Sequence, residues 1–206
     1  MSLCQMDMEE TKRTEMSFVV VSYYTADTLY EEQMKTLEKS LLRHHIPFRI
    51  KRIKSLGRWE DNVNYKPTFL KAMLKHYGKT KRDIVWTDCD AMFKAYPVLF
   101  DCTGWDFAVP IWRRRRGKEE ILSGTIYLKN CSHTRAILDA WEQECIENPD
   151  VWDQRSLAKV LKRGHEFQEM PLEYCKIFDR MDEIKQPVII HHQASRIVRK
   201  NSGALR

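Results

Sequence analysis

The sequence predicts a single α/β domain whose mostly parallel sheet is flanked by helices. Apolar, β-branched runs typical of buried strands alternate with helix-like stretches through the first half of the chain. The 206 residues suffice for one compact core, and no linker, repeat or low-complexity tract divides them. We therefore expect one domain over residues 16–196, with a flexible arm over 1–15 and a basic tail over 197–206.

The first half of the chain contains three expected strands and two expected helices. The strands are predicted from apolar runs and from alternation, and the helices from apolar residues three and four positions apart. Pro67 stands where a helix can begin and Gly78 where one can end. In chain order, we expect a strand over 16–24, a helix over 29–45, a strand over 48–53, a loop over 55–65, a helix over 67–78 and a strand over 83–87.

Shorter strands and two further helices are expected in the second half. Ser132 and Asp153 are residue types that commonly cap helices, and apolar residues repeat at helical spacing after each. Four adjacent arginines at 113–116 repel one another and predict a mobile, solvated loop that orders on an anionic ligand. In chain order, we expect strands over 105–110 and 121–128, helices from 132 and from 153, and strands over 167–170, 176–178 and 188–190.

Composition narrows the class of protein. No apolar run approaches the roughly 20 residues that a membrane-spanning helix needs, and the acidic N-terminus lacks the apolar segment of a signal peptide. The net charge of +6 suits an anionic partner without identifying it. The six cysteines form no CxxC pair, which indicates free thiols in a reducing compartment and hence a cytoplasmic protein.

Two acids, Asp88 and Asp90, stand directly after the predicted strand 83–87. Ligands of open α/β sheets bind beyond the carboxyl ends of strands, and two carboxylates one residue apart can share one divalent cation. Carboxylate oxygens suit Mg²⁺ or Mn²⁺, which in turn bridge to phosphate oxygens. The pair therefore predicts a metal site for a phosphate-bearing ligand, with a solvated acidic turn as the alternative.

A histidine pair follows the last predicted strand. His191 is a candidate third ligand through its neutral imidazole, and His192 is its alternate. A histidine that only caps the strand end is the alternative to both. Lys66 and Arg196 are candidate phosphate contacts, Arg196 in bidentate fashion, and Lys66 is otherwise a surface lysine.

Two short segments carry residues suited to a sugar. Gly124, between Ser123 and Thr125, would let a ligand approach the backbone closely, unless it marks only a β-bulge. Asp153 and Gln154 could hydrogen-bond sugar hydroxyls, and Asp153 could act as a base, unless it is simply an N-cap.

Taken in order, these segments resemble the GT-A-fold nucleotide-diphospho-sugar glycosyltransferases. The resemblance extends over about residues 17–196, nearly the whole chain. The matching segments are Phe18–Thr25, Lys66–Leu70, Val85–Asp90, Ser123–Leu128, Asp153–Gln154 and Ile189–His192.

The resemblance implies a role for each segment. Asp88 and Asp90 would form the DXD motif that binds metal and donor diphosphate, and His191 would complete the metal site. The residues 123–125 and 153–154 would face the transferred sugar and the acceptor. The nucleoside would be held by the first strand and its turn, at Tyr23, Tyr24 and Thr25.

We therefore expect a metal-dependent glycosyltransferase of hexosyltransferase type. It would use Mn²⁺ or Mg²⁺ to move a sugar from a nucleotide-diphosphate donor to a hydroxyl of a glycan, protein or small molecule. The chain is short for the family, so a partner could complete the acceptor site. Whether the enzyme inverts or retains the anomeric configuration stays open.

Two other functions were weighed against this one. A nucleotidyltransferase that forms sugar nucleotides usually has a Gly-rich phosphate loop after the first strand, and residues 22–29 contain no glycine. A basic nucleic-acid-binding module would use the arginines at 113–116 and the tail, but the chain carries no recognisable nucleic-acid motif. We expect neither a nucleic-acid partner nor a membrane span.

Overall fold

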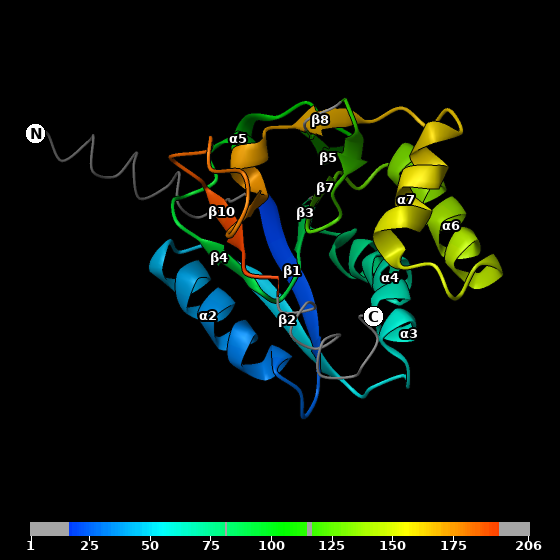
Figure 1. The fold of residues 1–206 in the computed structure, drawn as a ribbon, viewed down its shortest axis with the longest axis horizontal. Helices are drawn as coiled ribbons and strands as arrows, with labels where there is room; N and C mark the ends of the chain where they lie inside the picture. The colour runs from blue at the N-terminus through cyan, green and yellow to red at the C-terminus, as the bar shows by residue number, and fades with distance from the viewer. Residues whose placement is uncertain (1–16, 81, 115–116, 194–206) are drawn as a thin grey trace, which may run out of the picture.

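The computed structural model describes residues 17–80, 82–114 and 117–193. The expected arm and tail, Arg196, and two of the four adjacent arginines, Arg115 and Arg116, lie outside these ranges. A central mixed sheet has α2 on one face and α4, α6 and α7 on the other (Figure 1). No helix in the described part of the chain is long and apolar enough to cross a bilayer.

The first half of the domain builds the parallel part of the sheet. Strand β1 is buried along nearly its whole length and pairs in parallel with β2 on one side and β3 on the other. Its alternate side chains pack against α2 on one face and α4 on the other, as a buried central strand requires. The elements are β1 (Phe18–Thr25), α2 (Tyr30–Arg43), β2 (Phe48–Ile53), α3 (Trp59–Asn64), α4 (Lys66–Tyr77) and β3 (Asp83–Thr87).

The second half makes the sheet mixed, with strand order β2-β1-β3-β7-β5-β6. β7 runs antiparallel to β3 and β5, and β6 antiparallel to β5, while β8 pairs with β5 in parallel. Short connections join β5, β6 and β7, and strands joined without a crossover helix pair antiparallel. The elements are α5 (Leu99–Cys102), β5 (Phe107–Arg113), β6 (Glu119–Ile121), β7 (Thr125–Leu128), α6 (Ser132–Glu147), α7 (Asp153–Lys162) and β8 (Gln168–Met170).

A small second sheet has the order β4-β10-β9. β10 lies between the other two strands, antiparallel to β4 and parallel to β9. This sheet brings the end of the described chain beside the turn that follows β3. Its elements are β4 (Ala91–Phe93), the 3₁₀ turn η1 (Leu172–Tyr174), β9 (Lys176–Ile177) and β10 (Ile189–His191).

The single strand expected over 121–128 is instead two strands, because β6 ends at Ile121 and β7 begins at Thr125. Three further local expectations differ from the structure. The expected loop over 55–65 contains α3, a six-residue helix too short to show helical periodicity, which begins where Asp61 accepts the Arg58 backbone N–H at 3.2 Å. Neither Ser132 nor Asp153 caps a helix, because the N-cap positions are the preceding Cys131 and Trp152.

The third difference concerns the four arginines. Arg113 ends β5 and pairs with Glu119 at 3.0 Å and with Glu169, and Arg114 pairs with Glu120. The expected loop is therefore wrong for Arg113, which belongs to a strand, whereas Arg114 lies just beyond it. Ordering of the segment on an anionic ligand stays a prediction. The β5–β6 register places Glu119 directly opposite Arg113, so the hairpin supplies the offsetting acids.

Candidate functional site

The site lies at the carboxyl end of β3, where Asp88 and Asp90 follow the strand as predicted. The Asp88 backbone N–H donates to the Gly124 carbonyl at 2.9 Å, and the Ala91 N–H donates back to the Asp88 carbonyl at 3.0 Å. These bonds fix a tight turn between β3 and β4. Side chains alternate between the two faces of a sheet only within a strand. Because both acids lie in the turn beyond β3, this alternation does not determine where their carboxylates point.

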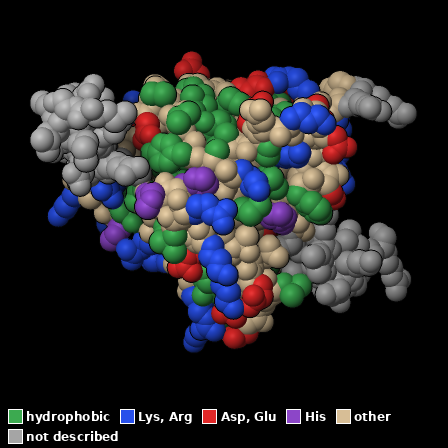
Figure 2. All heavy atoms as spheres, turned by 90° about the vertical axis from the view of Figure 1, so that its left-hand side faces the viewer, with side chains coloured by type: hydrophobic (Ala, Val, Ile, Leu, Met, Phe, Trp, Pro, Cys, Tyr) green, Lys and Arg blue, Asp and Glu red, His purple; other side chains and the backbone are tan. Residues whose placement is uncertain are grey.

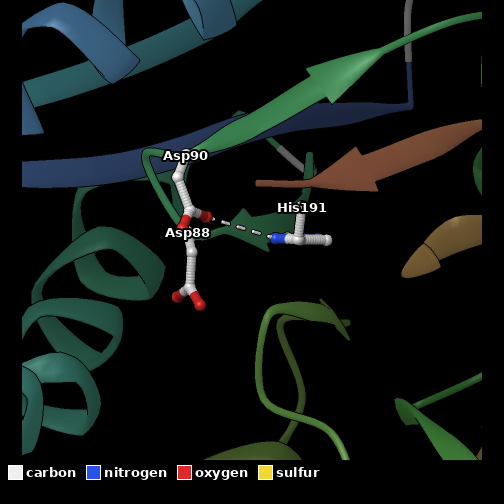
Figure 3. A group of neighbouring side chains, drawn as sticks. All are labelled: Asp88, Asp90 and His191. Carbon is white, nitrogen blue, oxygen red and sulfur yellow. Dashed lines mark ion pairs between the residues drawn. The ribbon is translucent and has the colours of Figure 1, made fainter. Parts of the chain in front are cut away.

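His191, at the end of β10, faces the two acids. Ligand atoms of Asp88, Asp90 and His191 all lie within 4.8 Å of one another, and Figure 3 shows Asp90 directed toward the imidazole. The distance from His191 Nδ1 to Asp90 Oδ1 is 3.6 Å. Two ligands on opposite sides of a cation such as Mg²⁺ lie about 4.2 Å apart, so small side-chain shifts would suffice for joint coordination.

The His191 ring is held from the side opposite the acids. Its Nε2 lies 2.9 Å from Thr125 Oγ1 on β7, whereas its buried Nδ1 has no hydrogen-bond partner among the described residues. A metal-binding histidine usually bonds through one ring nitrogen to the protein and offers the other to the cation. A buried ring nitrogen beside two carboxylates, once it has lost its proton, is therefore a ligand set that fits a divalent cation.

Gly124 closes the other side of this ring. A Cβ built there would stand 3.1 Å from His191 Cε1 and 3.3 Å from Cys175 Sγ. The sequence predicted a close approach of a ligand to this glycine. In the structure the group that approaches it is the imidazole of His191.

Lys66 is a buried ion-pair centre, so the surface lysine is ruled out. Its Nζ lies 2.9 Å from Asp88 Oδ1, 2.6 Å from Asp153 Oδ2 and 3.2 Å from the Ser123 carbonyl. Its side chain is 5% exposed and Asp153 is 7% exposed, whereas Asp88 is 39% exposed. Lys66 therefore connects the metal-site turn to the start of α7.

Burial and neighbouring charges shift three protonation equilibria here. Burial lowers the pKa of Lys66, but attraction to Asp153 and Asp88 outweighs it and the pKa is raised, so this amine stays charged. Burial raises the pKa of Asp88, which Lys66 only partly offsets. Burial lowers the pKa of His191, yet Cys175 and Asp90 raise it well above its ordinary value.

Asp153 and Gln154 begin α7 and turn inward. Asp153 Oδ2 also accepts a hydrogen bond from Ser123 Oγ at 3.0 Å, so this oxygen is bonded both to Lys66 and to Ser123. Gln154 Oε1 accepts the Ser123 backbone N–H at 3.3 Å, and its Nε2 donates to Glu120 at 2.9 Å. Ser123 is therefore fixed by both residues of the pair.

The three residues proposed to hold the nucleoside differ in accessibility. Tyr23 is 8% exposed and its hydroxyl donates to the Asn62 carbonyl at 2.7 Å, while Thr25 is 6% exposed. Tyr24 has an intermediate exposure and is the most accessible of the three. Their contact with a nucleoside stays a prediction, as does that of Arg196.

Sequence reasoning missed two contacts that shape the site. Trp86 donates its indole N–H to Asp88 Oδ1 at 3.1 Å, and its ring lies 5.0 Å from Lys66 Nζ. Asp88 lies in the turn beyond β3, so strand alternation does not predict this bond. Cys175 lies against Gly124 beside His191, and nothing in its sequence context indicates that position.

Comparisons with known proteins bear on the fold. No protein-family model matches the chain, and no curated protein is similar to it in sequence. Solved structures do match: a glycosyltransferase involved in glycosylation of the major capsid of PBCV-1 superposes with a TM-score of 0.69 at 13% identity, covering 91% of this chain and 99% of that one. The glycosyltransferase GlyE of Streptococcus pneumoniae TIGR4 superposes with a TM-score of 0.54 at 16% identity, covering 85% of this chain and 55% of that one. The apo form of GlyE gives the same TM-score of 0.54 at 15% identity. This chain therefore has the GT-A-like fold of glycosyltransferases.

Proposed function

We propose that this protein is a divalent-metal-dependent glycosyltransferase of hexosyltransferase type that uses a nucleotide-diphosphate sugar. The observation that carries the proposal is the convergence of Asp88, Asp90 and His191 at the carboxyl edge of β3, in a fold shared with glycosyltransferases. Free thiols at the five described cysteines support a reducing, cytoplasmic compartment.

Asp88, Asp90 and His191 would hold Mn²⁺ or Mg²⁺ through two carboxylates and one imidazole. The bound cation would supply electrostatic stabilisation of the diphosphate leaving group. Asp88 has one oxygen, Oδ1, bonded by Lys66 and Trp86, which fixes the position of its carboxylate. Thr125 and Gly124 fix the His191 ring from behind.

The remaining residues would position the sugar. Lys66 holds Asp153 and Ser123 at fixed distances from Asp88, which supports a positioning role for Asp153 over that of a base. Gln154 is less buried than Asp153 and would present its amide toward the transferred sugar. Tyr24 and Arg196 complete the proposed donor contacts, the acceptor being a glycan, a protein or a small molecule.

A thermal-shift screen of nucleotide sugars with and without Mn²⁺ tests the donor and the cation together. A donor at 100 times its dissociation constant should add about 2.7 kcal/mol of stability, and chelation of the cation should abolish this gain. Release of a nucleoside diphosphate from that donor identifies glycosyl transfer. Conversion of the donor with added pyrophosphate to a nucleoside triphosphate and a sugar 1-phosphate would identify nucleotidyl transfer and contradict the proposal.

A matched pair of histidine variants tests the ligand set. His191→Ala should weaken Mn²⁺ binding and abolish turnover, because the imidazole faces Asp90. His192→Ala is the control, since its side chain lies beside Phe178, with ring centroids 5.6 Å apart. Equal Mn²⁺ affinity in both variants, measured by titration, would reject His191 as a ligand.

A further inference from the structure

A hollow beside the site has no role in the donor chemistry proposed above. Its volume is about 460 Å³, and it lies between the β5–β6 hairpin and α7. Gln154 joins the two regions, because its amide bonds to Ser123 within the site and to Glu120 in the wall of the hollow. A molecule in the hollow would therefore lie next to the residues proposed to hold the transferred sugar.

The charge that lines the hollow is unbalanced. Four cationic and two acidic side chains contribute to its wall. Both acids are already paired, Glu119 with Arg113 and Glu120 with Arg114. Three cations of the wall form no ion pair with an acid in the described ranges, namely Lys118, Arg155 and Lys162. The hollow therefore offers unpaired positive charge at the edge of a sugar-handling site.

The hollow also has an apolar wall suited to a sugar ring. Trp152 and Phe167 contribute aromatic surface, and Ile121 and Ala158 contribute aliphatic surface. The Arg155 guanidinium lies 3.8 Å from the centroid of the Trp152 ring. This cation–π contact holds the guanidinium, a planar group of hydrogen-bond donors, against the ring. Apolar surface with a few fixed polar groups is typical of small-molecule sites.

We propose that this hollow is the acceptor subsite and that it takes a saccharide bearing an acid group, either a carboxylate or a phosphate. Arg155 and Lys162 would bind the acid group, and the aromatic surface would contact the C–H face of the ring. Gln154 would separate this saccharide from the donor. The inference rests on the proposed function, since it assigns the acceptor of the same reaction.

Three probes of one ring size distinguish the chemistry: methyl β-glucuronide, methyl β-glucoside 6-phosphate and neutral methyl β-glucoside. Binding to the full chain is measured by NMR titration without donor, and transfer is measured with the donor found by thermal shift. Either anion, or both, should bind about tenfold more tightly than the neutral probe, the change expected from one charge-assisted hydrogen bond. The anion that binds better identifies carboxylate or phosphate as the acid group.

Paired charge variants test the residues. The double variant Arg155→Gln/Lys162→Gln should lose the preference for the anion, through KM and with little change in kcat. Its hydrolysis of donor without acceptor should equal that of the wild type. Arg135→Gln is the control, an exposed arginine of neighbouring α6 whose guanidinium bonds to Asn130 and does not line the hollow.

The outcomes separate the two proposals. Equal binding of anionic and neutral probes by the wild type would overturn the subsite, and so would a preference that survives the double variant. Absence of transfer from the donor to any of the three probes, with anion binding that still depends on Arg155 and Lys162, would overturn glycosyl transfer and leave an acidic-saccharide site.

Discussion

At the scale of single residues, Gly124 controls the space available to a proposed metal ligand. Gly124→Ala would place a methyl group 3.1 Å from His191 Cε1 and 3.2 Å from its Nδ1, displacing the nitrogen that faces Asp90. Disturbing a group that orients a ligand typically costs 10–100-fold in metal affinity, so we expect a loss of about tenfold or more. Isothermal titration with Mn²⁺ measures it.

Gly104→Ala is the matched control for this change, because an added Cβ there meets nothing within 4 Å. Equal Mn²⁺ affinities in the two variants would show that the close approach of Gly124 to His191 is unimportant.

The protonation of two proposed ligands predicts a pH dependence. The pKa values of Asp88 and His191 are both raised, so each holds its proton to a higher pH than usual. A cation must displace those protons, and its affinity should therefore rise as pH increases from about 6 to about 8. Mn²⁺ titrations at several pH values measure the slope, and an affinity that is constant or falls over this range would contradict the assignment.

Residue types and their positions after strands predicted that the two acids and the histidine share a site. They did not predict the side chains packed around that site. Asp88, Asp90 and His191 converge as expected, because strand ends can be located from apolar runs. The burial of Lys66 and the ion pair that it forms with Asp153 depend on how α4 and α7 each pack against α6, which periodicity does not determine. The sequence thus indicated the ligands, and it named Lys66 and Gly124 without indicating that they contact those ligands.

At the scale of elements, Lys66 joins α4 to the turn after β3 and to the start of α7. Lys66→Met would leave Asp153 buried without its cation, and breaking a buried ion pair from one side costs about 3–5 kcal/mol. Urea unfolding should show a loss of this size. Lys54→Met, at an exposed position of the loop after β2, should change stability by less than about 0.5 kcal/mol.

The double variant Lys66→Met/Asp153→Leu separates a lost charge from lost packing. It should recover part of the stability, because it removes the unpaired carboxylate along with the amine. If the double variant loses as much free energy of unfolding as the two single variants lose together, Lys66 and Asp153 are not energetically coupled.

The elements of the first half were predicted closely, with β2 and β3 at their expected bounds. The parallel sheet expected from strand–helix alternation holds for β2, β1 and β3. Beyond β3 the sheet becomes mixed, because β5, β6 and β7 are connected without helices. The strand β4 and the helices α3 and α5 were missed, since three to six residues do not show a period.

At the scale of the whole molecule, the excess of positive charge is dispersed over the face that carries α2. Lysine and arginine side chains there are interspersed with acidic ones in the lower half of the view (Figure 2). Lys35 and Glu32 of α2 form one such pair at 2.6 Å.

The proposed metal site also joins distant parts of the chain. Asp88 and Asp90 end the first half, whereas His191 lies at the end of the described residues, on a three-residue strand at the centre of the small sheet. A cation bound to all three would act as a cross-link between the two halves of the chain. Cross-links that close long loops restrict the unfolded chain most. Local separation of β10 from β4 and β9 would then require release of the metal. Amide hydrogen exchange across β4 and β10 should therefore slow when Mn²⁺ is added, and should slow much less in His191→Ala. Equal exchange with and without Mn²⁺ would mean that the cation does not hold β10 in place. Slower exchange with Mn²⁺ would mean that the bound ion controls how often β10 separates from its neighbours.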